Sequence, residues 1–394
     1  MGLMNDYIAK GLSGDDLEKE LLSLIASYNK LTGNYLLVYS AAISKPIPGV
    51  SLSMDDYYII ADLLRNSKDG TLDVYIETPG GSGEAAEEIV KFLRSKYENI
   101  NYIVSGEAKS AGTLVVLSGN NIAMTATGSL GPVDAQVVIG RGQVSAHDYM
   151  EWVRTKQDEA IKQKRLSPFD ATMVAQISPG ELNGVNNALE FAHDLVVKWL
   201  PEYKFKNWDV TETDKTPVTD ALKKKRAREI AKALTDHSRW RSHGRSLKIQ
   251  DLEEIGLKID SIEDNKKKCE LVNKIQVVLR LLYATTSTHK VFAIEGSKIF
   301  ATAAMATIAS PIAQMPVQQA PDSVQADVPC PKCGTVHRVY AKFISNEDID
   351  KKMAQAGFEK LPKNAKLICS CGFEMDLTGL KNQIESNVGR KVVE

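Results

Sequence analysis

The stretch TLDVYIETPGGSGEAAEEIVKFLRSKYENINYIVSGEAKSAGTLVVLSGNNIAMTATGSLGPVD, residues 71–134, decides the fold. It contains two short apolar runs, LDVYIET and NYIVSG, and each one ends in small or glycine residues before a pattern of helical period. Strands that alternate with helices indicate crossover connections and a mostly parallel sheet. We expect the backbone to approach a ligand closely at two turns, one at Gly80 and Gly81 and one around Ser110.

The same alternation extends on both sides of this stretch. The residues before it predict an amphipathic helix over 15–30, a strand over 35–44 and a helix over 54–66. After it, VVIGRGQVSAHDYMEWVRTKQDEAIKQKR predicts a short strand and a long charged helix. Further helices are predicted over 181–200, 219–235 and 269–284, and residues 290–303 form either a hairpin or a strand that leads into a helix.

Composition indicates a globular protein with one large domain and appendages. The chain has 394 residues, of which 43% are apolar and 25% charged, and its net charge is −1. Such a balance provides no general attraction to nucleic acid or to anionic membranes, and the basic run 223–228 is expected to be the solvated face of a helix. No stretch resembles a signal peptide or a membrane span, so a cytoplasmic protein is expected.

Four of the five cysteines lie in the last 65 residues, which indicates a local metal site rather than a set of disulfides. Cys330 and Cys333 form a Cys-x-x-Cys-Gly motif, and Cys369 and Cys371 form a Cys-x-Cys-Gly motif. Four thiolates suit Zn²⁺ in a closed, structural site. We therefore predict a zinc ribbon, with four free thiols as the alternative, and we place no catalysis there. Cys269 is predicted to be a core residue.

Ser110 stands where the strand-like NYIVSG passes into the apolar helix AGTLVVLSG. A serine hydroxyl at the start of a helix lies near free N–H groups that stabilise negative charge, as a nucleophile requires. The same position also suits an ordinary helix N-cap. From the residues alone both interpretations stay open, and the glycines at 80 and 81 could equally form a simple turn.

The order of these motifs resembles the ClpP/crotonase superfamily and, within it, the serine dehydrogenase proteinase family, which is related to the signal peptide peptidase (SppA) type. The matching segments are YLLVYSAAIS, LDVYIETPGGSGEAAEEIVKFLRSKY, AKSAGTLVVLSGNNIAM, GSLGPVDAQ and SHGRSLKIQDLEEIGLKID. They span roughly residues 34–285. The N-terminal helix, the linker and the cysteine module lie outside the resemblance.

The resemblance implies an α/β fold built as a spiral of ββα units, and a serine peptidase that works through an acyl-enzyme. Ser110 falls on the nucleophile position, and Gly81 and Ala111 fall on the two backbone amides of the oxyanion hole. The family also forms homo-oligomers. No nucleotide-binding motif is present in this chain, so any dependence on ATP must come from a partner.

The general base is less clearly indicated. In Clp proteolytic subunits a histidine follows the serine by about 25 residues, and here no histidine stands in that region. The SppA type uses a lysine about 40–55 residues after the serine, a window that contains Lys156, Lys162 and Lys164. Lys164 fits best and Lys162 next, although each also suits a solvated helix face. Such a lysine must be desolvated to act as a base.

Three further residues are candidates for proton transfer. His243, in the segment SHGRS, titrates near neutral pH without a large shift, although it also suits a structural role at a helix cap. His147 lies between a predicted strand and a charged helix and could approach the site. Lys109 adjoins the serine, but neighbouring side chains diverge, so it is a poor base.

The sequence thus predicts an oligomeric serine peptidase of the ClpP/crotonase fold. The predicted divisions are an N-terminal helix (1–30), the protease domain (31–310), a Pro/Gln/Ala linker (311–328) and a zinc ribbon (329–394) that could bind a partner protein. Two alternatives stay open. One is an enzyme that stabilises the enolate of an acyl-CoA on the same fold, and the other is an inactive scaffold whose zinc ribbon recruits partners.

Overall fold

The computed structural model describes residues 2–393, except 46, 68–69, 134, 140–141, 212, 304–321 and 389. Contacts between Cα atoms divide the chain into two compact units, residues 1–305 and residues 306–394. Each unit has a hydrophobic core of its own. The first unit contains the stretch around Ser110, and the second contains the four clustered cysteines.

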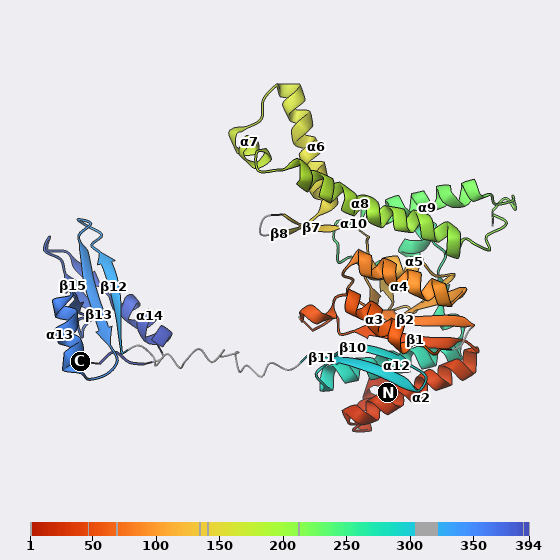
Figure 1. The fold of residues 1–394 in the computed structure, drawn as a ribbon, viewed down its shortest axis with the longest axis horizontal. Coiled ribbons are helices and arrows are strands. Elements are labelled where there is room, and N and C mark those ends of the chain that lie inside the picture. The colour runs from red at the N-terminus through yellow and green to blue at the C-terminus, as the bar shows by residue number, and fades with distance from the viewer. Residues whose placement is uncertain are drawn as a thin grey trace. The chain divides into compact units, whose positions relative to one another are not determined.

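A seven-stranded sheet forms the centre of the first unit (Figure 1), with the strand order β11-β10-β1-β2-β3-β5-β9. Its strands are β1 (Tyr35–Ala41), β2 (Thr71–Glu77), β3 (Asn99–Val104), β5 (Asn121–Met124), β9 (Asp260–Ser261), β10 (Thr288–Ile294) and β11 (Ser297–Thr302). The strands from β1 to β9 pair in parallel, and β10 and β11 add an antiparallel hairpin at the edge. The predicted α/β fold with a mostly parallel sheet is confirmed, and residues 290–303 form the hairpin.

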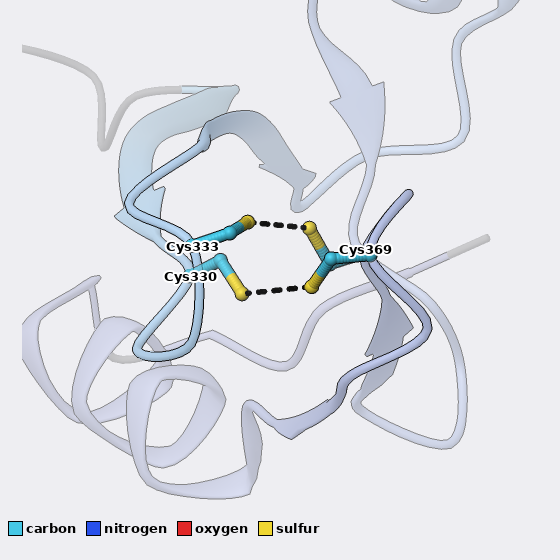
Figure 2. Close-up of side chains that lie close together, drawn as sticks. Cys330, Cys333 and Cys369 are labelled. Carbon is cyan, nitrogen blue, oxygen red and sulfur yellow. Dashed lines mark hydrogen bonds between the residues drawn. The ribbon is translucent and has the colours of Figure 1, made fainter.

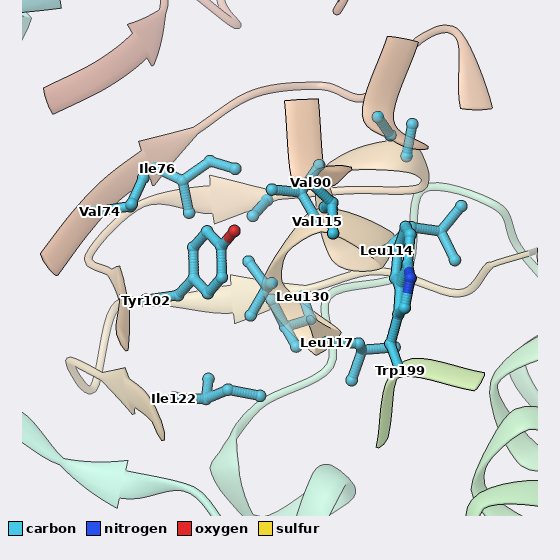
Figure 3. Close-up of a cluster of buried hydrophobic side chains, with 14 of the residues drawn as sticks. Val74, Ile76, Val90, Tyr102, Leu114, Val115, Leu117, Ile122, Leu130 and Trp199 are labelled. Carbon is cyan, nitrogen blue, oxygen red and sulfur yellow. The ribbon is translucent and has the colours of Figure 1, made fainter. Parts of the chain in front are cut away.

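Alternate residues of each central strand face two different cores, as the period of a strand requires. In β2, Leu72, Val74 and Ile76 belong to one core, whereas Tyr75 belongs to the other. Figure 3 shows the first core, which combines Val74 and Ile76 of β2 with residues of α5 such as Val115 and Leu114. Because both faces are covered, the strands read as almost continuous apolar runs in the sequence.

Helices cover the sheet on both faces (Figure 1). One core includes residues of α3 (Met54–Leu63), α4 (Gly83–Lys96), α5 (Ala111–Leu117), α8 (Pro179–Trp199) and α9 (Asp220–Thr235). The other includes residues of α1 (Leu3–Ala9), α2 (Gly14–Thr32) and α12 (Lys266–Thr285). No helix in the described part of the chain is long and apolar enough to cross a lipid bilayer.

The segment after the predicted loop GSLGPVD departs from expectation. Instead of one strand it forms a hairpin of β7 (Gln136–Ile139) and β8 (Gly142–Ser145), which precedes the long α6 (Ala146–Gln163) and the short α7 (Pro168–Val174). Figure 1 shows that α6 and α7 extend away from the sheet beyond α8. The remaining elements of this unit are η1 (Pro48–Val50), β4 (Glu107–Ala108), β6 (Ser129–Leu130), η2 (Leu200–Lys204), α10 (His237–Trp240), α11 (Ile249–Glu254) and η3 (Ile262–Asp264).

The second unit consists of two small sheets and two helices. These elements are β12 (Ser323–Pro329), β13 (Val336–Lys342), β14 (Glu359–Lys360), β15 (Lys366–Ile368), β16 (Glu374–Asp376), α13 (Glu347–Gln355) and α14 (Thr378–Val388). Strand β12 corrects the predicted linker, because residues 323–328 pair with β13 along their whole length. Residues 311–321 of that linker lie outside the described residues. The other predicted domain boundaries stay predictions.

Candidate active site

Two glycines let the turn after β2 lie directly against its neighbours. Gly81 has φ 155°, and a Cβ added there would lie 2.2 Å from the carbonyl oxygen of Leu52. Gly80 has φ 92°, and a Cβ added there would lie 2.6 Å from the carbonyl oxygen of Lys109 and 2.8 Å from Ser110 Cβ. Only glycine fits at either position, so the turn is built for close approach to the serine.

Backbone hydrogen bonds fix this turn from two sides. The N–H of Leu52 donates to Gly80 O at 2.8 Å, and the N–H of Ser82 donates to Leu52 O at 2.9 Å. On the other side, the N–H of Thr78 donates to Glu107 O at 2.8 Å and the N–H of Lys109 donates to Thr78 O at 3.0 Å. The turn is therefore tied both to the segment before α3 and to the segment that carries Ser110.

Ser110 occupies a strained backbone conformation at the start of α5. Its φ is 49° and its ψ is −116°, and its side chain makes no hydrogen bond that caps the helix. A non-glycine residue in such a region costs of order 1–3 kcal/mol and persists only where the surroundings enforce it. The side chain is thus not an N-cap, and the hydroxyl stays available to a ligand.

The amides expected to form an oxyanion hole have no acceptor within the described structure. Neither the N–H of Gly81 nor that of Ala111 donates a hydrogen bond to any described residue. The turn lies against the start of the helix, since a Cβ on Gly80, the residue before Gly81, would be 3.2 Å from Ala111 N. Free amides in a rigid turn and at the first position of a helix can stabilise an oxyanion without reorganisation.

A cavity of about 700 Å³ opens over Ser110. The turn at Gly80 and Gly81 and the start of α5 line one side of it. Apolar residues line another, among them Leu114 of α5 and Phe191 of α8. This volume and an apolar wall beside a few polar groups are typical of a site for a small molecule or a short peptide segment.

Of the candidate bases, only His243 is among the described residues that line this cavity. Lys162 and Lys164 are exposed at the end of α6, where Lys164 forms the C-cap with φ 56°. Lys156 pairs with Glu159 at 3.0 Å and with Asp170 at 3.3 Å. The cavity is therefore lined by Ser110, Gly81, Ala111 and His243 together. The candidate lysines of α6 are not among its described lining residues.

The two other candidate bases lie away from the Ser110 hydroxyl. His147, at the start of α6, is half-buried, and its Nδ1 lies 3.7 Å from Asp148 Oδ1 and 3.8 Å from Glu151 Oε2. Lys109 is buried, and its ammonium donates three hydrogen bonds to Leu130, Arg245 and Ser246. Because all three of its N–H donors have other partners, Lys109 is poorly placed to act as a base.

Sequence reasoning missed two parts of the cavity. The segment at Ser51 and Leu52 holds Gly81 in place, and α8 supplies the wall at Phe191. Both lie far in sequence from Ser110 and carry no motif. The one local indication of this contact is Gly83, because a Cβ there would lie 3.0 Å from Phe191 Cε1. A glycine in the sequence does not show which distant residue packs against it.

The second unit brings its four cysteines together (Figure 2). Sγ of Cys330 lies 3.8 Å from that of Cys371, and Sγ of Cys333 lies 3.5 Å from that of Cys369. All four sulfur atoms are within 4.8 Å of one another. A tetrahedral zinc with Zn–S bonds of about 2.3 Å requires sulfur atoms about 3.8 Å apart. The cluster can therefore hold a metal ion of that size.

Hydrogen bonds prepare the cluster for a cation. The cysteines share their protons: the backbone N–H of Cys371, with His337, lowers the pKa of the Cys369 thiol, while burial and the neighbouring thiols raise the pKa of Cys371. Each knuckle turns at a glycine of positive φ, 78° at Gly334 and 83° at Gly372. A thiolate is the form that binds metal, so this donor set suits a soft divalent ion.

Residues 51–206 match the model of a family described as ClpP-like SDH-type serine proteinase. The resemblance inferred from the motifs is thereby confirmed over this part of the chain, and so is the ClpP/crotonase-like α/β fold. These residues include Ser110 and both proposed oxyanion amides.

Two curated proteins of Methanocaldococcus jannaschii are similar in sequence. The chain is 28% identical over 207 residues to "Uncharacterized protein MJ0137" and 25% identical over 207 residues to "Uncharacterized protein MJ1495". The matches cover 52% of this chain and 59% and 58% of the two relatives. The chain therefore spans less than two thirds of the length of these relatives.

Among solved structures, two mutant forms of the 1510-N membrane-bound stomatin-specific protease align with this chain, one of them in complex with a substrate peptide. The first is 13% identical and covers 56% of this chain and 79% of its own, with a TM-score of 0.31. The peptide complex is 11% identical and covers 64% of this chain and 82% of its own, also with a TM-score of 0.31.

Proposed function

We propose that this chain is a serine peptidase in which Ser110 is the nucleophile. The observation that carries the proposal is the conformation of Ser110, whose strained backbone leaves the hydroxyl uncapped beside a cavity of about 700 Å³. The match of residues 51–206 to a family of serine proteinases supports the same activity. The substrate would be a protein or peptide with an apolar side chain against Leu114 and Phe191.

The proposed reaction follows from the groups around the hydroxyl. Ser110 Oγ attacks the scissile carbonyl carbon while a base accepts the hydroxyl proton, and the amides of Gly81 and Ala111 stabilise the resulting oxyanion. The base then protonates the leaving amine, which departs and leaves an acyl-enzyme on Ser110. Water, activated by the same base, attacks the ester and regenerates the serine.

For the base, we propose His243 ahead of Lys164 and Lys162. His243 lines the cavity, whereas the two lysines are exposed at the end of α6. Neither lysine is desolvated there, and desolvation is what a lysine needs in order to act as a base. Substituting His243 by alanine should lower the rate of labelling by a fluorophosphonate by several orders of magnitude and leave a slow residual rate, and a Lys162→Ala/Lys164→Ala variant should retain the wild-type rate. The opposite pattern would assign the base to α6.

Labelling of the serine tests the activity itself. A fluorophosphonate should react covalently with the wild-type chain, and Ser110→Ala should remove both this label and peptide hydrolysis while leaving the circular dichroism spectrum unchanged. Ser118→Ala is a suitable control, because Ser118 is a buried serine at the far end of α5. Labelling that persists in Ser110→Ala would reject the proposal. Turnover of an acyl-CoA by that variant would favour enolate chemistry instead.

We propose further that the cysteine cluster binds one structural Zn²⁺ and that the second unit is a zinc ribbon able to bind a partner protein. The sulfur separations of 3.8 and 3.5 Å support this proposal. With four thiolate ligands the ion would have no open position for catalysis. Elemental analysis of the purified protein should give one zinc per chain, and an absence of zinc in Cys333→Ser would assign it to this cluster.

We also propose that the chain forms homo-oligomers and that it is a cytoplasmic protein. We propose that the chain forms homo-oligomers through the region around α6 and α7, where Ile161 and Phe169 are 69% and 73% exposed. A contiguous patch of exposed apolar side chains marks an association surface, and we propose that these two residues belong to one. Four free thiols in a metal cluster fit the reducing cytoplasm. Ultracentrifugation of the wild type and of Phe169→Glu tests the assembly, which the substitution should weaken.

A further inference from the structure

Lys109 has an unusual environment for a lysine next to a proposed nucleophile. The residue is only 6% exposed, and its charged end lies among neutral oxygen atoms. Nζ donates to Leu130 O at 3.2 Å, to Arg245 O at 3.2 Å and to Ser246 Oγ at 2.8 Å. These bonds use all three donors of the ammonium group, and the charges of Glu107 and Lys248 act on it in opposite directions.

The three acceptors belong to two segments that meet beside the cavity. Leu130 belongs to β6, and it exchanges backbone hydrogen bonds of 3.1 and 2.9 Å with Leu247. Arg245 and Ser246 precede Leu247 directly, and His243 stands two residues before Arg245. The backbone of Lys109 itself is joined to Ser110, so one side chain connects the nucleophile's segment to the histidine's segment.

The site for this side chain is closely fitted. A Cβ added to Gly131 would lie 2.8 Å from Lys109 Cδ, so the lysine chain passes over a position that only glycine leaves open. Burial lowers the pKa of Lys109, which reflects the cost of holding a cation among neutral groups. A buried cation whose hydrogen bonds go only to neutral groups contributes little to stability. We therefore look for the role of Lys109 in the segment that its hydrogen bonds hold in place, residues 245–246.

We propose that Lys109 is a positioning residue that holds the segment of His243 at the distance from Ser110 that proton transfer requires. The inference rests on the proposed function, because it assumes that Ser110 and His243 react as a pair. Displacing a catalytic group by about 1 Å costs roughly 100-fold in rate. Lys109 does not touch the reacting atoms and acts only through the segment 243–246.

A double-mutant cycle tests this role. The measured quantity is the rate of fluorophosphonate labelling, with Lys109→Met expected to lower it by about 100-fold in the wild type. In a His243→Ala background the same substitution should change the remaining rate by less than about twofold, because residues that act as a unit are not additive. Equal effects of Lys109→Met in both backgrounds would show a merely structural role and overturn the proposal.

Two further variants keep the test decisive. Lys45→Met is the matched control, because Lys45 Nζ donates to Thr286 O at 3.0 Å and to Thr288 O at 2.9 Å away from the cavity. It should leave the labelling rate unchanged. If Lys109→Met does not fold, Ser246→Ala takes its place in the cycle, and additivity with His243→Ala would again overturn the proposal. Labelling of Ser110→Ala, by contrast, would reject the proposed function itself.

Discussion

Gly81→Ala tests whether the turn after β2 supplies an oxyanion donor. The new Cβ would lie 2.2 Å from Leu52 O and 2.6 Å from Leu52 N. A Cβ essentially never comes within 3.0 Å of a heavy atom outside its own residue and the two neighbouring residues. Both neighbours are backbone, so one of the two segments must move by roughly 1 Å. The bond from Leu52 N to Gly80 O, at 2.8 Å, would be strained or lost, and the Gly81 amide would turn away from the site.

The size of the effect follows from that displacement. Loss of one oxyanion-hole donor costs about 100- to 1,000-fold in kcat, or about 3–4 kcal/mol of transition-state stabilisation. The amide acts on charge that develops only during the reaction, so kcat should fall while KM changes little. The labelling rate by a fluorophosphonate should fall by a similar factor, since its adduct also places an oxygen in the hole.

A second glycine provides the control for this experiment. Gly296, in the turn between β10 and β11, has φ 80°, and a Cβ added there would meet no other atom within 4 Å. Gly296→Ala therefore carries only the cost of a left-handed alanine, about 1–2 kcal/mol. Both variants should unfold at lower temperature than the wild type, but only Gly81→Ala should lose activity. Wild-type kcat in a folded Gly81→Ala protein would refute the assignment of this amide.

Two other predictions concern stability. Removing zinc with a chelator should unfold residues 322–393, with loss of their hydrogen-exchange protection, because about 10 kcal/mol or more of metal binding stabilises such a module; labelling of Ser110 should persist, and unchanged protection would contradict a structural zinc. Burial lowers the pKa of His289 below its ordinary 6.5. The unfolded chain then binds more protons below that pH, so the free energy of unfolding should fall as the pH drops from about 7 to about 5. His289→Gln should flatten this dependence in urea titrations, and an unchanged slope would exclude His289 as its source.

Local patterns were sufficient for most of the elements of the first unit and for the meeting of the two turns. Parallel strands end at the same edge of a sheet, so the segments after β2 and β3 had to lie side by side. The two cysteine motifs likewise had to meet if they share an ion, and their clustering is confirmed. Each of these predictions needs only the period of the apolar residues and the position of small residues between them.

The parts that escaped prediction depend on long-range packing. Leu52 pairs with Gly81 through two backbone hydrogen bonds, which any residue at position 52 could make. Strand β12 continues a segment whose composition indicates a linker, although Val324, Ala326 and Val328 alternate with polar residues as in a half-buried strand that pairs on one side, with β13. The lysines of α6 match the spacing from Ser110 that the resemblance implies, but spacing does not determine the direction in which a long helix leaves the sheet.

The two interpretations of Ser110 can be compared within this chain, because other serines do cap helices. Ser13, Ser82 and Ser178 have φ of −70°, −68° and −93°, and each side chain accepts a hydrogen bond from the third residue of its helix. Ser110 differs in both respects, with φ 49° and no cap bond. A serine needed only as a cap would adopt the relaxed conformation of the other three. The turn at Gly80 and Gly81 instead packs directly against Ser110 and enforces its strained conformation. In that conformation the hydroxyl makes no cap hydrogen bond to the helix.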